Sequence, residues 1–278
     1  MKIGLLTLRH TSKVKSPIMP EVVRLLEEWG AQVEIIYPEE RCTAASAVRV
    51  EHDLYVLKSE TELNLSFAGA LHAAGASILN PYHVSSMMND KFVVMRRLAE
   101  ARVPVPETYV TGSPRQLAHL LETGPVVLKP YRAAKGRGVQ LIWDPDQLDD
   151  VADEGLVFVQ HYHKPEGRDR KIYCIGGQLF GVMRSWPAHT YEEKLGEAFS
   201  VDATLRDIAL RAGAAFGIDL FGVDIIVSDG QPFVVDMQSF PGFKGVPEAA
   251  LRLADYVYAT AERVLAGGAV VGWAQRVA

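Results

Sequence analysis

The sequence contains little cysteine, with only Cys42 and Cys174 among 278 residues. They lie far apart and without the spacing of a metal site, which argues against a disulfide framework and fits a reducing cytoplasm. No apolar run near the N-terminus is long enough to span a membrane, and the charge order there is wrong for a signal peptide. The net charge of −5 argues against a general nucleic-acid binder or a membrane-surface protein. A soluble intracellular globular protein is therefore expected.

Two glycine-rich patterns that commonly bind nucleotides are also missing. The sequence contains no G-x-x-x-x-G-K-[ST] loop, and no G-x-G-x-x-G follows the first predicted strand. Low-complexity tracts and internal repeats are absent as well. With 278 residues, of which 48% are hydrophobic, the chain can nevertheless bury a large core in two or three subdomains.

The first 85 residues alternate between strand and helix signals. Apolar runs predict strands at 3–8, 32–37, 53–58 and 76–79, and helices are predicted at 20–29 and 62–74. This alternation predicts an N-terminal Rossmann-like domain, residues 1–85, with a small parallel sheet flanked by helices. Lys58 falls at the carboxyl end of a strand, where such domains commonly present ligand groups. It is a candidate substrate contact or, alternatively, a solvated lysine at a strand end.

Two further units are expected after this domain. Residues 86–160 contain most of an amphipathic helix, 84–101, followed by short strands and two short helices near 114–121 and 145–151. Residues 161–278 contain a hairpin at 170–184, a helix at 205–216, two strands with acidic residues and a closing helix at 247–265. The predicted fold class is therefore α/β, with α+β subdomains that follow the parallel sheet.

Two carboxylates interrupt apolar strands near the C-terminus. Asp224 lies within FGVDIIV and Asp236 within PFVVDMQ, and the period of a strand places Gln238 on the same face as Asp236. If the connecting loop holds three residues, Asp224 lies directly across from Asp236. Buried carboxylates need a partner or a cation, and these strands contain no lysine or arginine. The three oxygen donors therefore predict a site for Mg²⁺ or Mn²⁺ with a nucleotide phosphate, the alternative being a polar hairpin that faces a loop.

A basic, glycine-rich loop follows the apolar strand PVVLKP. Lys129 leaves this strand near its end, and Lys135, Gly136 and Gly138 come shortly afterwards. Glycine lets backbone N–H groups approach a ligand closely, and lysine adds positive charge, so this loop is predicted to contact phosphate. A solvated basic turn would have the same sequence.

Two more segments are candidates for nucleotide contact. Lys91 stands at a predicted helix start, where free N–H groups already favour anions, so a lysine there is misplaced as a stabiliser and is predicted to bind phosphate. The segment FVQHYHKPEGRD has a backbone that could meet an adenine edge, with Glu166 near the ribose. His161 and His163 alternate in this segment, but no third ligand lies nearby to complete a metal site.

Two cations end or begin apolar strands in the predicted hairpin 170–184. Lys171 and Arg184 are candidate catalytic residues that would grip a transferring phosphoryl group beside the carboxylates. Their alternative role is simple charge balance for Asp224 and Asp236, which would be compatible with catalysis.

In this order along the chain, the motifs resemble the ATP-grasp superfamily over essentially the whole sequence. The resemblance implies two α+β subdomains, 86–160 and 161–278, that clasp Mg-ATP after the Rossmann-like domain. It implies phosphate contacts by Lys91 and Lys129, metal ligation by Asp224, Asp236 and Gln238, an adenine hinge at Gln160, His161 and His163, and an ATP-site position for Asp169.

Two branches of that superfamily compete for the function. GRDRKIYCIGGQLFGVMRS is similar to the Asp-Ile-Arg strand, hairpin and arginine of ligases that add amino acids to ribosomal-protein tails or to lysine-biosynthesis carrier proteins. VVDMQSFPGFKGVPE is closer to the Asp-Ile-Asn-x-Phe-Pro-Gly-Tyr stretch of inositol-phosphate kinases. Lys58, Arg184 and Gly242 are the candidate acceptor contacts.

The sequence departs from both branches. Gln238 stands where both usually have Asn, and Asp236 replaces the usual Glu of the ligases. We expect an ATP-dependent carboxylate–amine ligase that acts through an acyl phosphate on a small-molecule, amino-acid or peptide acceptor. A small-molecule kinase and a non-catalytic nucleotide-binding protein are the alternatives. Neither nucleic acid nor a membrane is an expected partner, and a homo-oligomer is compatible with the sequence.

Overall fold

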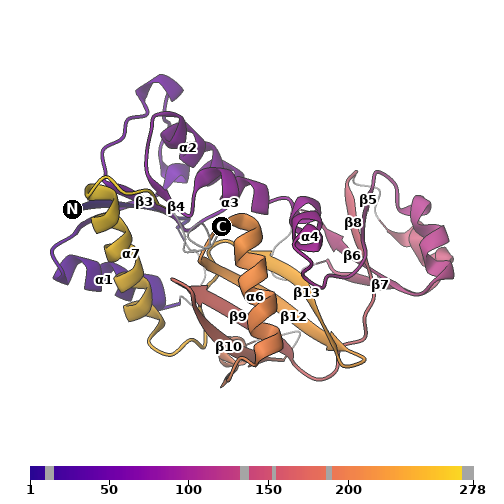
Figure 1. The fold of residues 1–278 in the computed structure, drawn as a ribbon. Helices are drawn as coiled ribbons and strands as arrows, with labels where there is room; N and C mark the ends of the chain where they lie inside the picture. Colours follow the sequence, from indigo (N-terminus) through magenta and orange to yellow (C-terminus); the bar gives the residue numbers. More distant parts are fainter. Residues whose placement is uncertain (10–15, 132–137, 152–154, 186–189, 271–278) are drawn as a thin grey trace.

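The computed structural model describes residues 1–9, 16–131, 138–151, 155–185 and 190–270. The strands in these ranges form three sheets, and each sheet is built from a contiguous stretch of the chain (Figure 1). The mixed architecture of one parallel and two antiparallel sheets confirms the predicted α/β class. We keep the three segments 1–85, 86–160 and 161–278 as a proposal for the domains.

The first sheet is parallel and has the strand order β2-β1-β3-β4. Its strands and the two main helices are β1 (Lys2–Leu6), α1 (Ile18–Glu28), β2 (Gln32–Ile36), β3 (Leu54–Leu57), α2 (Glu62–Ala73) and β4 (Ile78–Leu79). The central strand β3 is buried along its whole length, as expected for a parallel strand covered on both faces. Two short 3₁₀ turns, η1 (Pro38–Glu40) and η2 (Ala45–Ala47), lie between β2 and β3.

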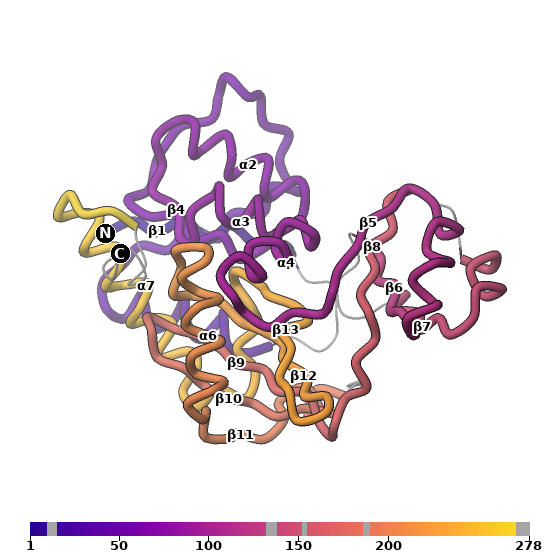
Figure 2. The backbone as a smooth tube through the Cα atoms, turned by 45° about the vertical axis from the view of Figure 1, so that its right-hand side comes forward, coloured from indigo at the N-terminus to yellow at the C-terminus, as the bar shows by residue number. Residues whose placement is uncertain are grey.

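The second sheet stands to one side of the molecule (Figure 2). It has the order β5-β8-β6-β7 and consists of β5 (Thr108–Thr111), β6 (Val126–Pro130), β7 (Gln140–Ile142) and β8 (Val157–His161). Two helical segments, η3 (Pro114–Glu122) and η4 (Pro145–Asp150), cover it with Leu117, Leu120 and Leu148. Both segments are 3₁₀ helices, and each begins with proline after an extended residue.

The third sheet is antiparallel and separates an apolar face, covered by a helix, from a face that carries polar groups. Its order is β11-β10-β9-β12-β13, and its elements are β9 (Asp169–Ile175), β10 (Gln178–Arg184), α5 (Tyr191–Leu195), β11 (Glu197–Phe199), α6 (Ala203–Phe216), β12 (Leu220–Ser228) and β13 (Gln231–Gln238). Ile172 and Val223 pack against Ile208 of α6 in one cluster. Strand alternation therefore turns Lys171 and Asp224 to the opposite face.

The prediction of a single helix over 84–101 is wrong. The structure has two helices, α3 (Tyr82–Met88) and α4 (Lys91–Glu100), separated by Asn89 and Asp90. The carboxylate of Asp90 accepts a hydrogen bond from the backbone N–H of Val93 at 3.0 Å and begins α4 as its N-cap. Phe92, expected on the buried face, is 38% exposed at the start of α4, whereas Met95 and Leu98 are buried as expected.

The last helix returns to the first sheet. α7 (Ala249–Leu265) packs on α1 and β3, and its buried residues Leu253 and Val257 share one core with Ile3 and with Tyr173 of β9. The N-terminal sheet and the third sheet are therefore joined through α7 and the loop that precedes it. This loop, residues 239–248, passes the carboxyl end of β3.

The loop 239–248 depends on one glycine. Gly245 has a φ of +79°, and a Cβ atom built on it would lie 2.0 Å from the carbonyl oxygen of Leu195. We expect Gly245→Ala to lower the free energy of unfolding by about 3–5 kcal/mol, because left-handed strain and a backbone clash add together. Equilibrium denaturation with urea measures this change.

Gly230 supplies a matched control for that variant. It has a φ of +71° in the β12–β13 turn, but no atom of the described residues lies within 4 Å of the position that a Cβ atom would take there. Gly230→Ala should therefore cost only the strain of about 1 kcal/mol. Equal destabilisation of the two variants would contradict the proposed clash at Gly245.

Candidate functional site

The two carboxylates face each other across the β12–β13 hairpin. Asp224 and Asp236 are directly opposed in the register, as predicted, but the connecting turn holds two residues rather than three. A register shift next to Asp224 makes up the difference, because Val234 pairs with Ile225 and leaves Val235 as an extra residue. Val234 and Met237 both lie in the core, although regular alternation would separate them. The bulge thus brings Asp236 to the polar face of the sheet.

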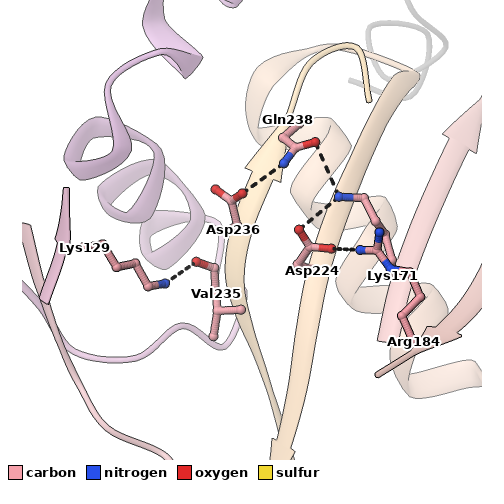
Figure 3. A network of polar contacts seen from close by, with 7 residues as sticks. All are labelled: Lys129, Lys171, Arg184, Asp224, Val235, Asp236 and Gln238. Carbon is pink, nitrogen blue, oxygen red and sulfur yellow. Dashed lines mark hydrogen bonds and ion pairs between the residues drawn. The ribbon is translucent and has the colours of Figure 1, made fainter. Parts of the chain in front are cut away.

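Asp236 and Gln238 lie on one side of β13 (Figure 3). The side-chain amide of Gln238 donates a hydrogen bond to Asp236 at 3.1 Å. Its carbonyl oxygen accepts from the Lys171 ammonium at 3.4 Å. Gln238 therefore links the carboxylate of Asp236 on β13 to Lys171 on β9.

Asp224 is held by the two predicted catalytic cations. Lys171 stands directly opposite it on β9 and approaches its carboxylate at 2.9 Å, and Arg184 of β10 approaches the other oxygen at 3.0 Å. Lys171 is almost fully buried, with 4% of its surface exposed, so this pairing is needed to keep its charge in the protein. Lys171 and Arg184 therefore balance the charge of Asp224, which was the alternative role considered for these two cations.

Asp169 begins β9 beside this group and pairs in register with Arg184. Burial and the nearby Asp224 carboxylate raise the pKa of Asp169 to about 6, and Arg184 opposes that shift. The raised pKa means that the folded protein binds a proton at Asp169 more tightly than the unfolded chain does. The protonated Asp169 therefore contributes to the free energy of unfolding. This contribution is fully present below the pKa that Asp169 has in the unfolded chain, and it is lost as the pH rises through about 6.

We therefore expect Asp169→Asn to become progressively more stable than the wild type between pH 4 and pH 7. The gain should reach on the order of 1–2 kcal/mol, because partial exposure to solvent reduces the electrostatic effect. Urea denaturation of both proteins across this pH range measures the difference. A difference that stays constant with pH would show that Asp169 does not titrate in this range.

Lys129 crosses from the second sheet to the third. Its ammonium donates to the carbonyl oxygen of Val235 at 3.1 Å and to the side-chain oxygen of Gln160 at 2.6 Å. Val235 is the extra residue of the bulge, so the irregularity in β13 also presents this acceptor. Burial lowers the pKa of Lys129, and the charge of Asp236 opposes the shift. The lysine therefore lies within electrostatic reach of the candidate metal ligands.

Lys91 approaches the same region from the start of α4. Its ammonium donates to the carbonyl oxygen of Pro130, at the end of β6, at 2.8 Å. Burial lowers the pKa of Lys91, and Asp236 again opposes the shift. The two predicted phosphate lysines are thus brought together on the side of Asp236, whereas Lys171 and Arg184 lie on the side of Asp224.

The predicted adenine hinge lies at the end of β8. Gln160 is 2% exposed, and its amide donates to the hydroxyl of Thr108 at 3.1 Å while its oxygen receives Lys129. The backbone N–H of His161 donates to the carbonyl of Glu107 at 3.0 Å. His163 stacks on Phe233 with ring centroids 4.0 Å apart. Gln160 therefore holds Lys129, the predicted phosphate ligand, a contact that the sequence did not indicate.

The remaining predicted nucleotide contacts are Lys135, Gly136, Gly138 and Glu166. Lys135 and Gly136 lie outside the described residues. Gly138 has a φ of +73°, and a side-chain carbon there would approach Pro130 to 2.8 Å. Glu166 binds the backbone N–H of Gly230 at 3.2 Å, so its carboxylate contacts the β12–β13 turn.

The candidate acceptor residues lie beyond the end of β13. Lys58 donates to the carbonyl oxygen of Phe240 at 3.0 Å and lies over its ring, and burial lowers its pKa to about 8. Gly242 is exposed in the same loop. Sequence reasoning missed Glu60, whose carboxylate accepts a hydrogen bond from the hydroxyl of Ser239. The signal available for it was its position two residues after Lys58.

The donor set fits a hard divalent cation. Asp224, Asp236 and Gln238 supply carboxylate and amide oxygens, and Mg²⁺ is commonly bound by one or two carboxylates with the rest of its shell from water and phosphate. In the described part of the chain, no group of three His, Cys, Asp or Glu residues forms a metal site by itself. The arrangement suits an ion that arrives with a nucleotide rather than a closed structural site.

This arrangement of one parallel and two antiparallel sheets is also found in ATP-grasp proteins. A solved RimK-domain ATP-grasp protein from Sphaerobacter thermophilus has the same fold, with a TM-score of 0.73 and 21% identity over 93% of this chain and 100% of that one. The family model of the RimK-like ATP-grasp domain matches residues 88–257, and the chain belongs to that family. The predicted superfamily is therefore confirmed.

Two further proteins are similar to this chain. A probable alpha-L-glutamate ligase of Parasynechococcus marenigrum is 26% identical over 192 residues, which are 64% of this chain and 41% of that protein. The chain therefore spans less than half the length of this relative. An ATP-grasp ligase solved with its minimal precursor, Mg and ADP has a TM-score of 0.68 and 17% identity, over 94% of this chain and 97% of that one. No helix in the described ranges is both long and apolar enough to cross a membrane.

Proposed function

We propose that this chain is an ATP-dependent ligase that joins a carboxylate to an amine through an acyl phosphate. Membership of the RimK-like family and the similarity to a glutamate ligase support this function. The observation that carries it is the division of cations around the two carboxylates. Lys91 and Lys129 lie near Asp236, whereas Lys171 and Arg184 hold Asp224. This arrangement suits a phosphate chain on one side and a second anion on the other.

In the first step, a substrate carboxylate oxygen attacks the γ-phosphorus of ATP and ADP leaves. Lys91 and Lys129 would bind the phosphates and offset their charge. Arg184 and Lys171 would turn part of their hydrogen bonding from Asp224 to the oxygens of the transferring group. A Mg²⁺ ion held by Asp236, Gln238 and Asp224 would supply further charge neutralisation when bound.

In the second step, an amine nitrogen attacks the acyl carbon, phosphate leaves and the nitrogen loses a proton. The same cations stabilise the oxygen that becomes negative during this attack. Precise placement of the two substrates does much of the remaining work.

We infer that the acceptor is an amino acid or a peptide, because the similar proteins are named for glutamate ligation or were solved with a precursor. We also infer a cytoplasmic location, because Cys42 and Cys174 form no disulfide.

Product analysis tests the function directly. The purified chain is incubated with Mg-ATP and pools of amino acids, short peptides and polyols, and ADP release is followed with mass spectrometry of the products. Release of ADP and phosphate with an amide product is expected. A stable phosphorylated acceptor would instead identify a kinase, and nucleotide binding without turnover would identify a non-catalytic protein.

A further inference from the structure

Glu60, in the loop after β3 of the first sheet, places its carboxylate beside the end of β13, the strand that carries Asp236 and Gln238. It follows β3 by three residues, and its carboxylate accepts a hydrogen bond from the hydroxyl of Ser239. Ser239 directly follows Gln238, the last residue of β13. A residue 179 positions earlier in the chain is therefore placed beside the site.

The position of Ser239 is fixed by buried contacts. Ser239 is fully buried, and its carbonyl oxygen accepts a hydrogen bond from the side-chain amide of Asn80. Asn80 is itself 1% exposed and also donates to the carbonyl of Leu220 at 2.7 Å. Glu60 thus contacts a buried junction between the first and third sheets.

The electrostatic surroundings of Glu60 join it to the active site. Burial raises its pKa, and the Asp236 carboxylate raises it further, whereas the Ser239 hydroxyl and Lys58 lower it. Lys58 in turn interacts with Lys244 of the loop 239–248. Glu60 therefore lies at the boundary between the carboxylate of Asp236 and a pair of lysines.

A ligase of the proposed kind must hold three charged partners. The phosphates and the substrate carboxylate are anions, for which Lys91, Lys129, Lys171 and Arg184 are suited. The amine arrives as an ammonium ion, for which a carboxylate is suited. Asp224 is already paired with two cations, whereas the hydrogen-bond partner of Glu60 is a neutral hydroxyl. Glu60 is half-buried rather than fully enclosed.

We propose that Glu60 binds the ammonium group of the acceptor and positions its nitrogen, which attacks the acyl carbon of the acyl phosphate after one ammonium proton has left to solvent. Lys58 and Lys244 complete a mixed-charge acceptor site beside it. These two lysines would lie near the carboxylate or carbonyl of the acceptor, so the site suits an α-amino acid or a peptide N-terminus. This assignment rests on the proposed ligase function. It adds an acceptor-binding residue, located after β3 of the first sheet, to a site whose carboxylates lie on β12 and β13 of the third sheet.

Glu60→Gln separates amine binding from a structural role. Glutamine keeps the oxygen that accepts the Ser239 hydrogen bond and removes the charge, so a merely structural residue would tolerate the change. We expect the KM for the amine substrate to rise about 10- to 100-fold, while the affinity for a non-hydrolysable ATP analogue stays within about twofold. Ser239→Ala, which removes the hydrogen bond but keeps the carboxylate, should lower Tm and raise this KM much less.

A binding measurement keeps the test independent of turnover. L-glutamate and N-acetyl-L-glutamate are titrated into the wild type and Glu60→Gln, each loaded with Mg²⁺ and the ATP analogue. Binding of glutamate by the wild type, with at least about tenfold weaker binding both by the variant and after acetylation, supports the assignment. Equal glutamate affinity in the two proteins, or no glutamate binding by the wild type, overturns it. A wild type that binds glutamate but forms no amide contradicts the ligase function alone.

Discussion

Replacement of Asp236 by asparagine is expected to lower turnover by at least about 100-fold and to leave the fold intact. The substitution removes one negative charge from the candidate metal site and should weaken Mg²⁺ binding there, and a bound ion contributes several kcal/mol to stabilising a transferring phosphoryl group. It creates no cavity, and the asparagine oxygen can still accept the hydrogen bond from Gln238. Steady-state ADP release at limiting Mg²⁺, together with thermal denaturation, measures both effects.

Asp224→Asn provides a contrast with this variant. Asp224 balances Lys171 and Arg184, so its replacement leaves two partly buried cations without their anion and should lower the stability by about 3–5 kcal/mol. Asp236→Asn should therefore lose activity at nearly unchanged Tm, whereas Asp224→Asn should lose both. Wild-type turnover by Asp236→Asn at limiting Mg²⁺ would refute its assignment as a metal ligand.

Lys129→Ala and Arg184→Ala are expected to damage different steps. Lys129→Ala should weaken nucleotide binding about 10- to 100-fold, because a charge-assisted phosphate contact is worth roughly 1.5–3 kcal/mol. Arg184→Ala should leave that affinity nearly unchanged and lower kcat and kcat/KM together, because its contact forms in the transition state. Lys171 still balances Asp224 in the second variant. Calorimetric titration of a non-hydrolysable ATP analogue and steady-state kinetics separate the two outcomes.

Lys129→Met serves as a control for packing in this comparison. Methionine fills most of the lysine volume, so it restores any affinity lost through a cavity but not the affinity lost with the charge. Lys91→Ala should resemble Lys129→Ala, because both lysines lie near Asp236. If Arg184→Ala loses nucleotide affinity as severely as Lys129→Ala, the division between phosphate and acceptor cations is wrong.

Several elements follow from the sequence because their signals are local. The buried run Leu54–Leu57 and its neighbours predicted a parallel sheet, and the apolar spacing over 205–216 predicted α6 with its buried face. Asp224 and Asp236 were also predicted from a local signal. Each is a charged residue within an apolar strand, and a charge in a buried strand needs a partner. The break between α3 and α4 escaped this approach, because Asp90 caps a new helix within a continuous apolar pattern.

The sequence by itself determined which residues carry charge in the candidate site and on which strands they lie. Tertiary structure alone decided what they face. The bulge at Val235 re-aims Asp236 and provides a carbonyl for Lys129, yet no residue type in the strand requires a bulge there. Lys171 meets Asp224, and Glu60 meets Ser239, across 53 and 179 residues of chain. Such contacts depend on sheet order and on the packing of distant segments, and periodicity describes only the segment in which it occurs.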